Sequence, residues 1–101
     1  MPKKIKVPFY AKIAAKQGLK ERKVNKAGLN KEQAQKLGIF SGVERAKQIL
    51  RNKYLFEKDL KQIASFYLRF RNQKSKRAQT AIKLWGGRRF GALLAKIYYK
   101  K

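Results

Sequence analysis

Hydrophobic residues in this chain recur at the spacing of helices. Near the C-terminus, Phe90, Leu93, Leu94, Ile97 and Tyr98 have the i, i+3, i+4, i+7, i+8 spacing of one helix face. No segment alternates between apolar and polar residues for long enough to predict a strand. The pattern therefore predicts an all-α fold.

Proline and glycine bound the predicted helices. Pro8 is well placed as a first helical residue and Gly18 as a helix end, after which residues 18–29 are expected to be a basic loop. We expect helices over residues 8–18, 31–37, 42–52, 57–72, 75–85 and 88–99. The result is a small single-domain helical bundle of about five to six short helices. Residues 1–29 form an extended basic N-terminal arm with one short helix, and residues 30–101 form the helical domain.

Four of the five acidic residues are explained by helix starts. Ser41 and Glu44 have the spacing of a capping box, as do Asn30 and Gln33, which place Glu32 in a first turn. Glu57 and Asp59 begin the next apolar segment, where the helix dipole favours negative charge. No carboxylate pair is left for acid–base chemistry or for magnesium. We therefore expect a protein that is not an enzyme and has no small-molecule substrate.

The charge of the chain indicates a polyanionic partner. It has 101 residues, with 28 Lys and Arg against 5 Asp and Glu, giving a net charge of +23. The last block, residues 60–101, contains no acid. Solubility requires far less charge than this, so nucleic acid is the expected partner.

Other classes of site are excluded by composition. The chain has no cysteine and no histidine, which excludes disulfides, thiol nucleophiles and the usual zinc ligands. We expect no metal and no cofactor. The longest uncharged run, residues 37–43, is far below the roughly 18 residues needed to cross a bilayer, so no membrane partner is expected.

Three groups of basic residues are the candidate nucleic-acid contacts. The first lies in the N-terminal arm, the second around the turn after the 57–72 helix, and the third at the start of the last helix. In that order they are Lys3, Lys4, Lys6 and Lys12; Arg69, Arg71, Lys74, Lys76 and Arg77; and Arg88 and Arg89.

The Leu-Trp-Gly-Gly stretch is interpreted as a helix end. Gly86 can adopt the left-handed conformation that closes a helix, Gly87 lets the chain reverse, and Trp85 has the spacing of a core residue. A nucleotide-binding loop is disfavoured because no strand precedes these glycines and no Lys-Ser/Thr pair follows them.

Four aromatic residues near the chain ends could stack on bases. They are Phe9, Tyr10, Tyr98 and Tyr99. Aromatic residues at helical spacing are more often in the core, so we expect only Tyr10 and Tyr99 to lie outside it.

Three segments between Leu37 and Lys101 resemble a small domain of tailed bacteriophages, found beside prohead-protease-type head proteins. They are Gly42-Val-Glu-Arg45-Ala46, Ile63-x-x-Phe66-x-x-Arg69 and Leu84-Trp85-Gly86-Gly87. The resemblance implies that six residues define the fold, beside the capping pair Ser41 and Glu44; they are Arg45, Ala46, Leu84, Trp85, Gly86 and Gly87. Here Arg88 replaces the acid that commonly follows the two glycines, residues 72–75 are a shorter link than usual, and there is no protease domain.

The resemblance implies a phage head component, located in the virion and in the host cytoplasm during assembly. Such a protein would neutralise packaged DNA and dock on a larger head protein. Three alternatives stay open: a ribosomal-type RNA-binding protein, a helical DNA-binding regulator, and a cationic membrane-active helix over residues 88–101.

Overall fold

The computed structural model describes residues 3–25 and 42–99, without the side chains of residues 23–25 and 77. Ser41, the Asn30–Gln33 cap and the helix expected over residues 31–37 lie outside these ranges. The elements are β1 (Lys4–Lys6), α1 (Phe9–Asn25), α3 (Gly42–Arg51), β2 (Tyr54–Phe56), α4 (Glu57–Phe70), α5 (Lys76–Leu84) and α6 (Gly87–Tyr99).

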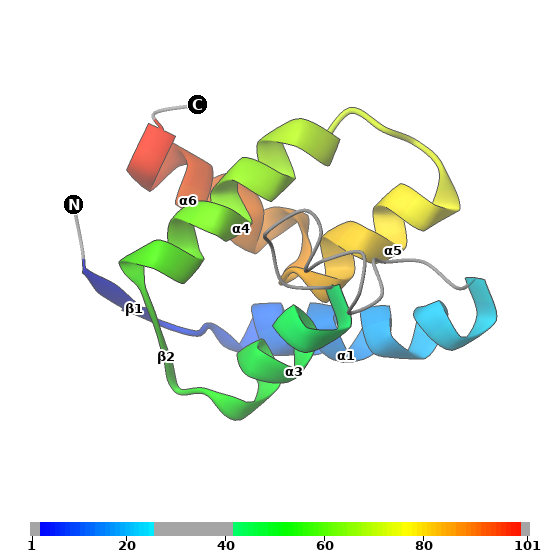
Figure 1. Ribbon diagram of the computed structural model, residues 1–101, viewed down its shortest axis with the longest axis horizontal. Coiled ribbons are helices and arrows are strands. Elements are labelled where there is room, and N and C mark those ends of the chain that lie inside the picture. Colours follow the sequence, from blue (N-terminus) through cyan, green and yellow to red (C-terminus); the bar gives the residue numbers. More distant parts are fainter. Residues whose placement is uncertain (1–2, 26–41, 100–101) are drawn as a thin grey trace.

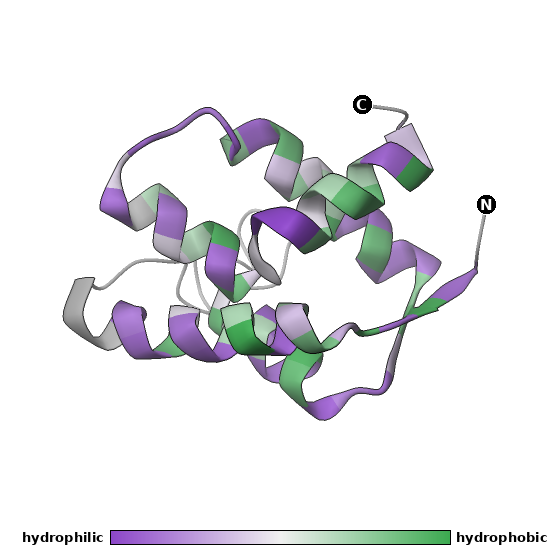
Figure 2. Cartoon of the chain, turned by 180° about the vertical axis from the view of Figure 1, so that it is seen from behind, coloured by the Kyte–Doolittle hydropathy of each residue, from purple (hydrophilic) through white to green (hydrophobic). Residues whose placement is uncertain are grey.

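The all-α prediction is confirmed. The four helices expected between residues 42 and 99 are present, with ends within two residues of the expected positions. In Figure 1, α1 runs across the lower part of the molecule and packs against α5 and α3. Helices α4 and α6 pack against each other in the upper part. Figure 2 shows hydrophobic and hydrophilic residues interspersed along these helices, as expected when each helix contributes one face to a shared core.

A short antiparallel ribbon is the element that the hydrophobic pattern does not predict. β1 pairs with β2 in the register Lys4↔Phe56, Ile5↔Leu55, Lys6↔Tyr54. Three residues per strand are too few to show a period of two, and the pairing joins segments fifty residues apart. The expectation that no strand forms is therefore wrong. Residues 3–7 are extended, as expected, but they are bound to the body of the protein rather than free of it.

Helix α1 continues past Gly18, so the expected helix end there is wrong and residues 18–25 are helical rather than a loop. A Cβ atom built on Gly18 would lie 2.7 Å from the backbone nitrogen of Leu84, at the end of α5. The glycine is therefore needed for close approach of two helices. Sequence alone does not distinguish this role from a helix stop.

The Trp85 turn has the conformation predicted for it. Gly86 and Gly87 have φ values of 103° and 86°, in the left-handed region, between the end of α5 and the start of α6. Trp85 is 4 % exposed, and its ring stacks on Phe66 at 4.3 Å between centroids. The expected core position of Trp85 is confirmed.

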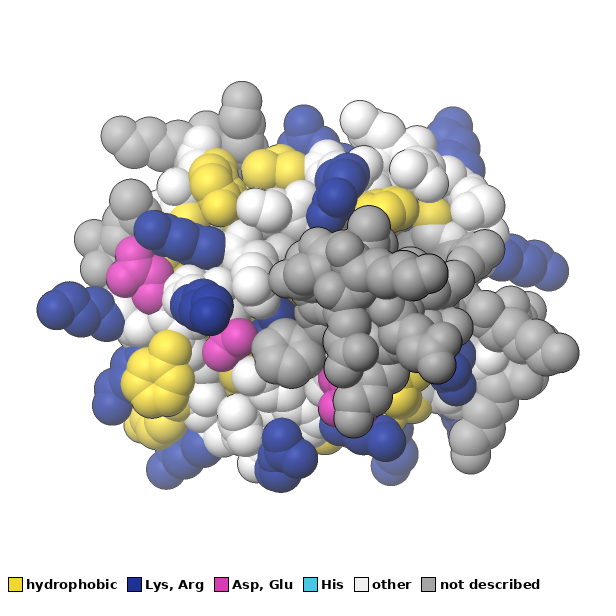
Figure 3. Space-filling view, in the orientation of Figure 1, with side chains coloured by type: hydrophobic (Ala, Val, Ile, Leu, Met, Phe, Trp, Pro, Cys, Tyr) yellow, Lys and Arg dark blue, Asp and Glu magenta, His cyan; other side chains and the backbone are white. Residues whose placement is uncertain are grey.

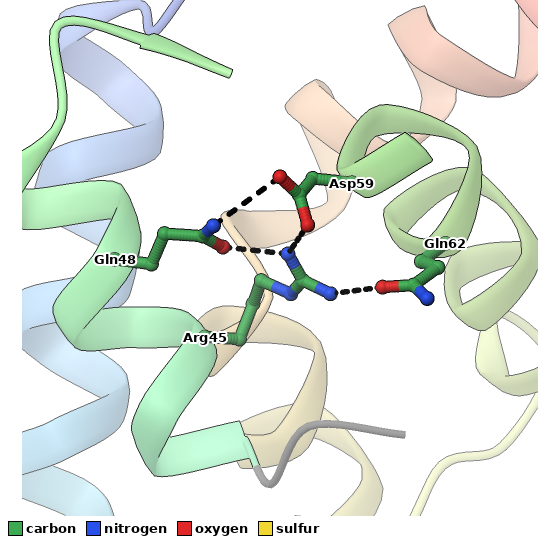
Figure 4. Close-up of polar contacts among 4 residues, drawn as sticks. All are labelled: Arg45, Gln48, Asp59 and Gln62. Atoms are coloured by element: carbon green, nitrogen blue, oxygen red, sulfur yellow. Dashed lines mark hydrogen bonds and ion pairs between the residues drawn. The ribbon is translucent and has the colours of Figure 1, made fainter. Parts of the chain in front are cut away.

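A buried cation joins α3 to α4. The Arg45 side chain is fully buried, and its guanidinium donates to Asp59 Oδ1 at 2.9 Å and to the side-chain oxygens of Gln48 and Gln62 (Figure 4). Gln48 also donates to Asp59 Oδ2 at 3.3 Å. The guanidinium carbon lies 4.8 Å from the Trp85 ring centroid. Burial lowers the pKa of Arg45 from its ordinary value, and the hydrogen bond to Asp59 opposes that shift.

Asp59 was expected only as a helix-start residue. It does lie in the first turn of α4, but its main contact is this ion pair across two helices. The sequence offers no signal for the pairing, because the two residues are fourteen positions apart and on different elements.

We expect Asp59→Ala to destabilise the fold by about 3 kcal/mol, because it leaves the buried Arg45 charge without its counter-ion. Arg45→Met should cost less, since the remaining carboxylate is 22 % exposed and can be hydrated. The measurement is urea denaturation followed by circular dichroism. Glu57→Ala, which breaks the exposed pair with Lys61, is the control and should change stability little. Equal small losses in all three variants would contradict the assigned role of Arg45.

Candidate nucleic-acid interface

The first two groups of candidate cations lie at opposite ends of α4. Lys4 and Lys6 are on the ribbon that leads into this helix, and the second group surrounds the turn that follows it. A helix of 14 residues is about 20 Å long. The first group and the second group are therefore separated by the length of this helix and do not form one patch.

The turn after α4 presents four exposed cations, which we call the turn cluster. Its members are Arg69, Arg71, Lys74 and Lys76. Within the described ranges, no ion pair includes any of them, and residues 60–101 contain no acid. Arg77 belongs to the same segment, but its side chain lies outside the description. An exposed, uncompensated group of positive charges is what a phosphate backbone requires.

Three hydrogen bonds that involve side chains support the backbone beneath the turn cluster. Ser75 Oγ accepts from the backbone N–H of Ala78 at 3.1 Å, which caps the start of α5. Gln79 donates to the Lys74 carbonyl at 3.1 Å, and Arg88 Nη1 donates to the Arg71 carbonyl at 2.8 Å. The turn between α4 and α5, around which the turn cluster lies, is thus supported by side chains of α5 and α6 and by the Ser75 cap.

Arg88 and Arg89 are exposed at the start of α6, but each has a partner within the chain. Arg88 supports the turn through the Arg71 carbonyl, which places it beside the turn cluster. The Arg89 guanidinium lies 4.3 Å from the Tyr10 ring centroid. Tyr10, expected to be available for stacking, is half-buried, with this cation over its ring.

Lys12 was expected to belong to a flexible arm that contacts phosphates, and the structure gives it another role. Its Nζ donates to the carbonyls of Ile49, Leu50 and Asn52 at 3.1, 3.0 and 3.0 Å. These carbonyls lie at the end of α3, where the last turn of a helix leaves oxygens without partners. All three ammonium protons are therefore used, and we remove Lys12 from the candidate contacts.

A hollow of about 270 Å³ lies beside the start of α6. Its lining includes Gln17, Lys83 and Arg88. Lys83 is paired with Glu21 at 2.5 Å, and Thr80 donates to the other oxygen of the same carboxylate at 3.1 Å. The Lys83 hydrogen bond lowers the pKa of Glu21, against an opposing effect of burial. One of the two cations that line the hollow, Lys83, therefore already has its counter-ion.

The aromatic residues are only partly where the sequence placed them. Tyr98 is buried, as expected, and burial raises its pKa. Tyr99 is 39 % exposed, and its hydroxyl shares a 3.0 Å hydrogen bond with Ser65. Phe9, expected in the core, is 77 % exposed, so that expectation is wrong. Two further exposed aromatics, Tyr54 and Phe56, lie on β2 and carry no helical spacing that could have singled them out.

The described part of the chain holds no group of three or more metal-ligating side chains. Within the same ranges, none of the helices has the length and apolar character required to cross a bilayer. No protein-family model, curated protein or solved structure matches this chain.

We expect Lys12→Met to destabilise the protein by about 2 kcal/mol, because three charge-assisted hydrogen bonds to carbonyl oxygens are lost. Its affinity for DNA should stay close to that of a variant such as Lys47→Met, which removes one exposed charge from α3. Thermal denaturation and fluorescence anisotropy with labelled DNA give the two quantities. A stable Lys12→Met protein with a clearly weaker affinity would return Lys12 to the interface.

Proposed function

We propose that this chain is a non-enzymatic structural protein that binds the phosphate backbone of nucleic acid, with DNA as the favoured partner. The observation that supports the proposal most directly is the turn cluster: four exposed cations around one turn, within residues 60–101, which contain no Asp or Glu. Binding of this kind needs positive charge at a defined place and no reactive group.

The pairing of the acids strengthens the proposal. Among the described residues, three acids are in ion pairs within the chain: Glu21 with Lys83, Glu57 with Lys61 and Asp59 with Arg45. These pairs neutralise three cations and leave most of the others facing solvent. Figure 3 shows lysine and arginine side chains around the outline of the molecule, with few acidic side chains between them. Such a charge excess opposes compaction unless a polyanion is bound.

The proposal of a phage-head context comes from the sequence resemblance. Its motif residues form one unit in the structure: Arg45 lies against Trp85, and Gly86 closes the helix that ends there. This unit supports the idea that the motif defines a fold. In a head, the turn cluster would face packaged DNA, and the protein would dock on a larger head protein.

We expect DNA binding to depend steeply on salt. If about eight phosphates are engaged, the slope of log K against log salt should be near −7. Replacing all four turn-cluster cations by glutamine should make the slope less negative by about 3 to 4, because each neutralised phosphate contributes about 0.9. Fluorescence anisotropy on duplex DNA over a salt series measures this slope.

A matched control removes the same charge elsewhere. Lys16, Lys20, Lys47 and Lys58 are exposed on α1, α3 and the start of α4, and replacing them by glutamine should leave most of the slope. Equal changes in both fourfold variants would mean that charge, and not the turn cluster, determines binding. Salt-insensitive binding by the unmodified protein would refute the electrostatic proposal itself.

The virion context predicts a fixed number of copies in purified particles from cells that make this protein. Quantitative mass spectrometry of virions and of ribosomes, purified separately, measures that number. Constant stoichiometry in virions is the expected result, because a head component is built in during assembly. Recovery on ribosomes with absence from virions would instead favour the RNA-binding alternative.

A further inference from the structure

The β1–β2 ribbon has one face in the core and one in solvent. Ile5 and Leu55 are paired across the strands; Leu55 is fully buried, and Ile5 packs against the core. Because side chains alternate along a strand, their neighbours must point outward. We call this surface the outer ribbon face; it consists of Lys4, Lys6, Tyr54 and Phe56.

The two aromatic rings on this face are exposed, whereas other aromatic residues of the same fold are buried. Phe56 is 61 % exposed and Tyr54 is 38 % exposed, whereas Phe90 is fully buried. Isolated exposed aromatics are common on protein surfaces. Here two rings stand at alternate positions of one strand, opposite two lysines of the other, which is an ordered arrangement.

The rings lie among cations. Lys4 Nζ is 4.8 Å from the Tyr54 ring centroid, and Lys53 Nζ is 5.8 Å from it. The nearest carboxylate along the chain, Glu57, is held by Lys61 at 2.9 Å, and that hydrogen bond lowers its pKa. The outer ribbon face therefore combines flat apolar surfaces with an excess of positive charge.

The backbone of the ribbon is fixed at both ends. Val7 N–H donates to the Lys53 carbonyl at 2.9 Å, and Glu57 N–H donates to the Lys3 carbonyl at 2.8 Å. These bonds lie just outside the three paired residues on each strand. The rings are thus presented from a defined support, so binding a flat ligand would order few additional groups.

We propose that the outer ribbon face binds single-stranded nucleic acid, with bases stacking on Tyr54 and Phe56 and with Lys4, Lys6 and Lys53 contacting phosphates. The inference rests on the proposed function and names the form of nucleic acid that this surface takes. Aromatic platforms beside cations are how proteins hold single strands without reading their sequence.

The spacing of the rings favours an extended strand over a duplex. Residues two apart on a strand are separated by about 6.6 Å. Stacked bases in a duplex are about 3.4 Å apart and are closed to an inserted ring. A strand with unstacked bases can place one base on each ring when the exposed side chains of Lys4 and Lys53 turn from the Tyr54 ring toward its phosphates. A partner protein is the weaker fit, because the outer ribbon face offers no acid that could pair with lysines or arginines of the partner.

The test compares oligothymidylate, a duplex of the same length, and heparin, which has the charges of a polyanion but no bases. We expect Tyr54→Ala/Phe56→Ala to weaken oligothymidylate binding by about tenfold or more for each ring. Its heparin affinity and its salt slope should be unchanged, because the lysines remain. Phe9→Ala is the matched control, since it removes a ring from α1 that is more exposed than either ribbon ring and should leave all three affinities unchanged.

Two further variants keep the test decisive if the double alanine protein folds poorly. Tyr54→Leu/Phe56→Leu retains apolar bulk and should lose the preference for oligothymidylate, while Tyr54→Phe/Phe56→Tyr retains both rings and should keep it. Lys4→Gln/Lys6→Gln should reduce the salt slope on single strands by about 1.4.

Unchanged oligothymidylate affinity in the leucine variant would overturn the inference. An equal loss of heparin and oligothymidylate binding would do the same, because it would show a loss of charge contacts rather than of stacking. Failure of the proposed function looks different: the unmodified protein would then bind neither polyanion in a salt-dependent manner.

Discussion

The buried guanidinium of Arg45 is the constraint on which the arrangement of the helices depends. It is anchored in α3, it is neutralised by Asp59 of α4, and it lies against Trp85 at the end of α5. A charge without access to solvent is tolerated only when its partners are in place. Three helices are therefore held in one relative position, and the left-handed turn at Gly86 sets the start of α6 from there.

The relative position of the helices determines where the cationic surfaces lie. Helix α4 begins at the ribbon and ends at the turn cluster, so the two cationic surfaces are held about 20 Å apart. One presents the four exposed cations of the turn cluster around the turn between α4 and α5, and the other presents rings among lysines. Among the described residues, Glu21, Glu57 and Asp59 are engaged in ion pairs within the chain, so they do not neutralise the cations of either surface.

Lysines that are alike in sequence have different roles in the structure. Lys12 closes the end of α3, Lys83 pairs with Glu21, and Lys4 lies over Tyr54. A count of charges treats these lysines as equivalent. Their roles differ because each contacts a different group, a carbonyl, a carboxylate or a ring, that a distant segment supplies. The turn-cluster cations could be grouped from sequence, since they are close together in the chain and no acid lies near them.

The sequence by itself determined the helical class, four helix positions between residues 42 and 99, the left-handed glycine and the excess charge. Each of these depends on spacing within a few residues or on composition, which local physics controls. The tertiary structure decided that α1 passes through Gly18, that residues 4–6 pair with 54–56, and that Arg45 meets Asp59. These three features depend on contacts between segments far apart in the chain. Such contacts form because burial and pairing of the whole chain outweigh local preference.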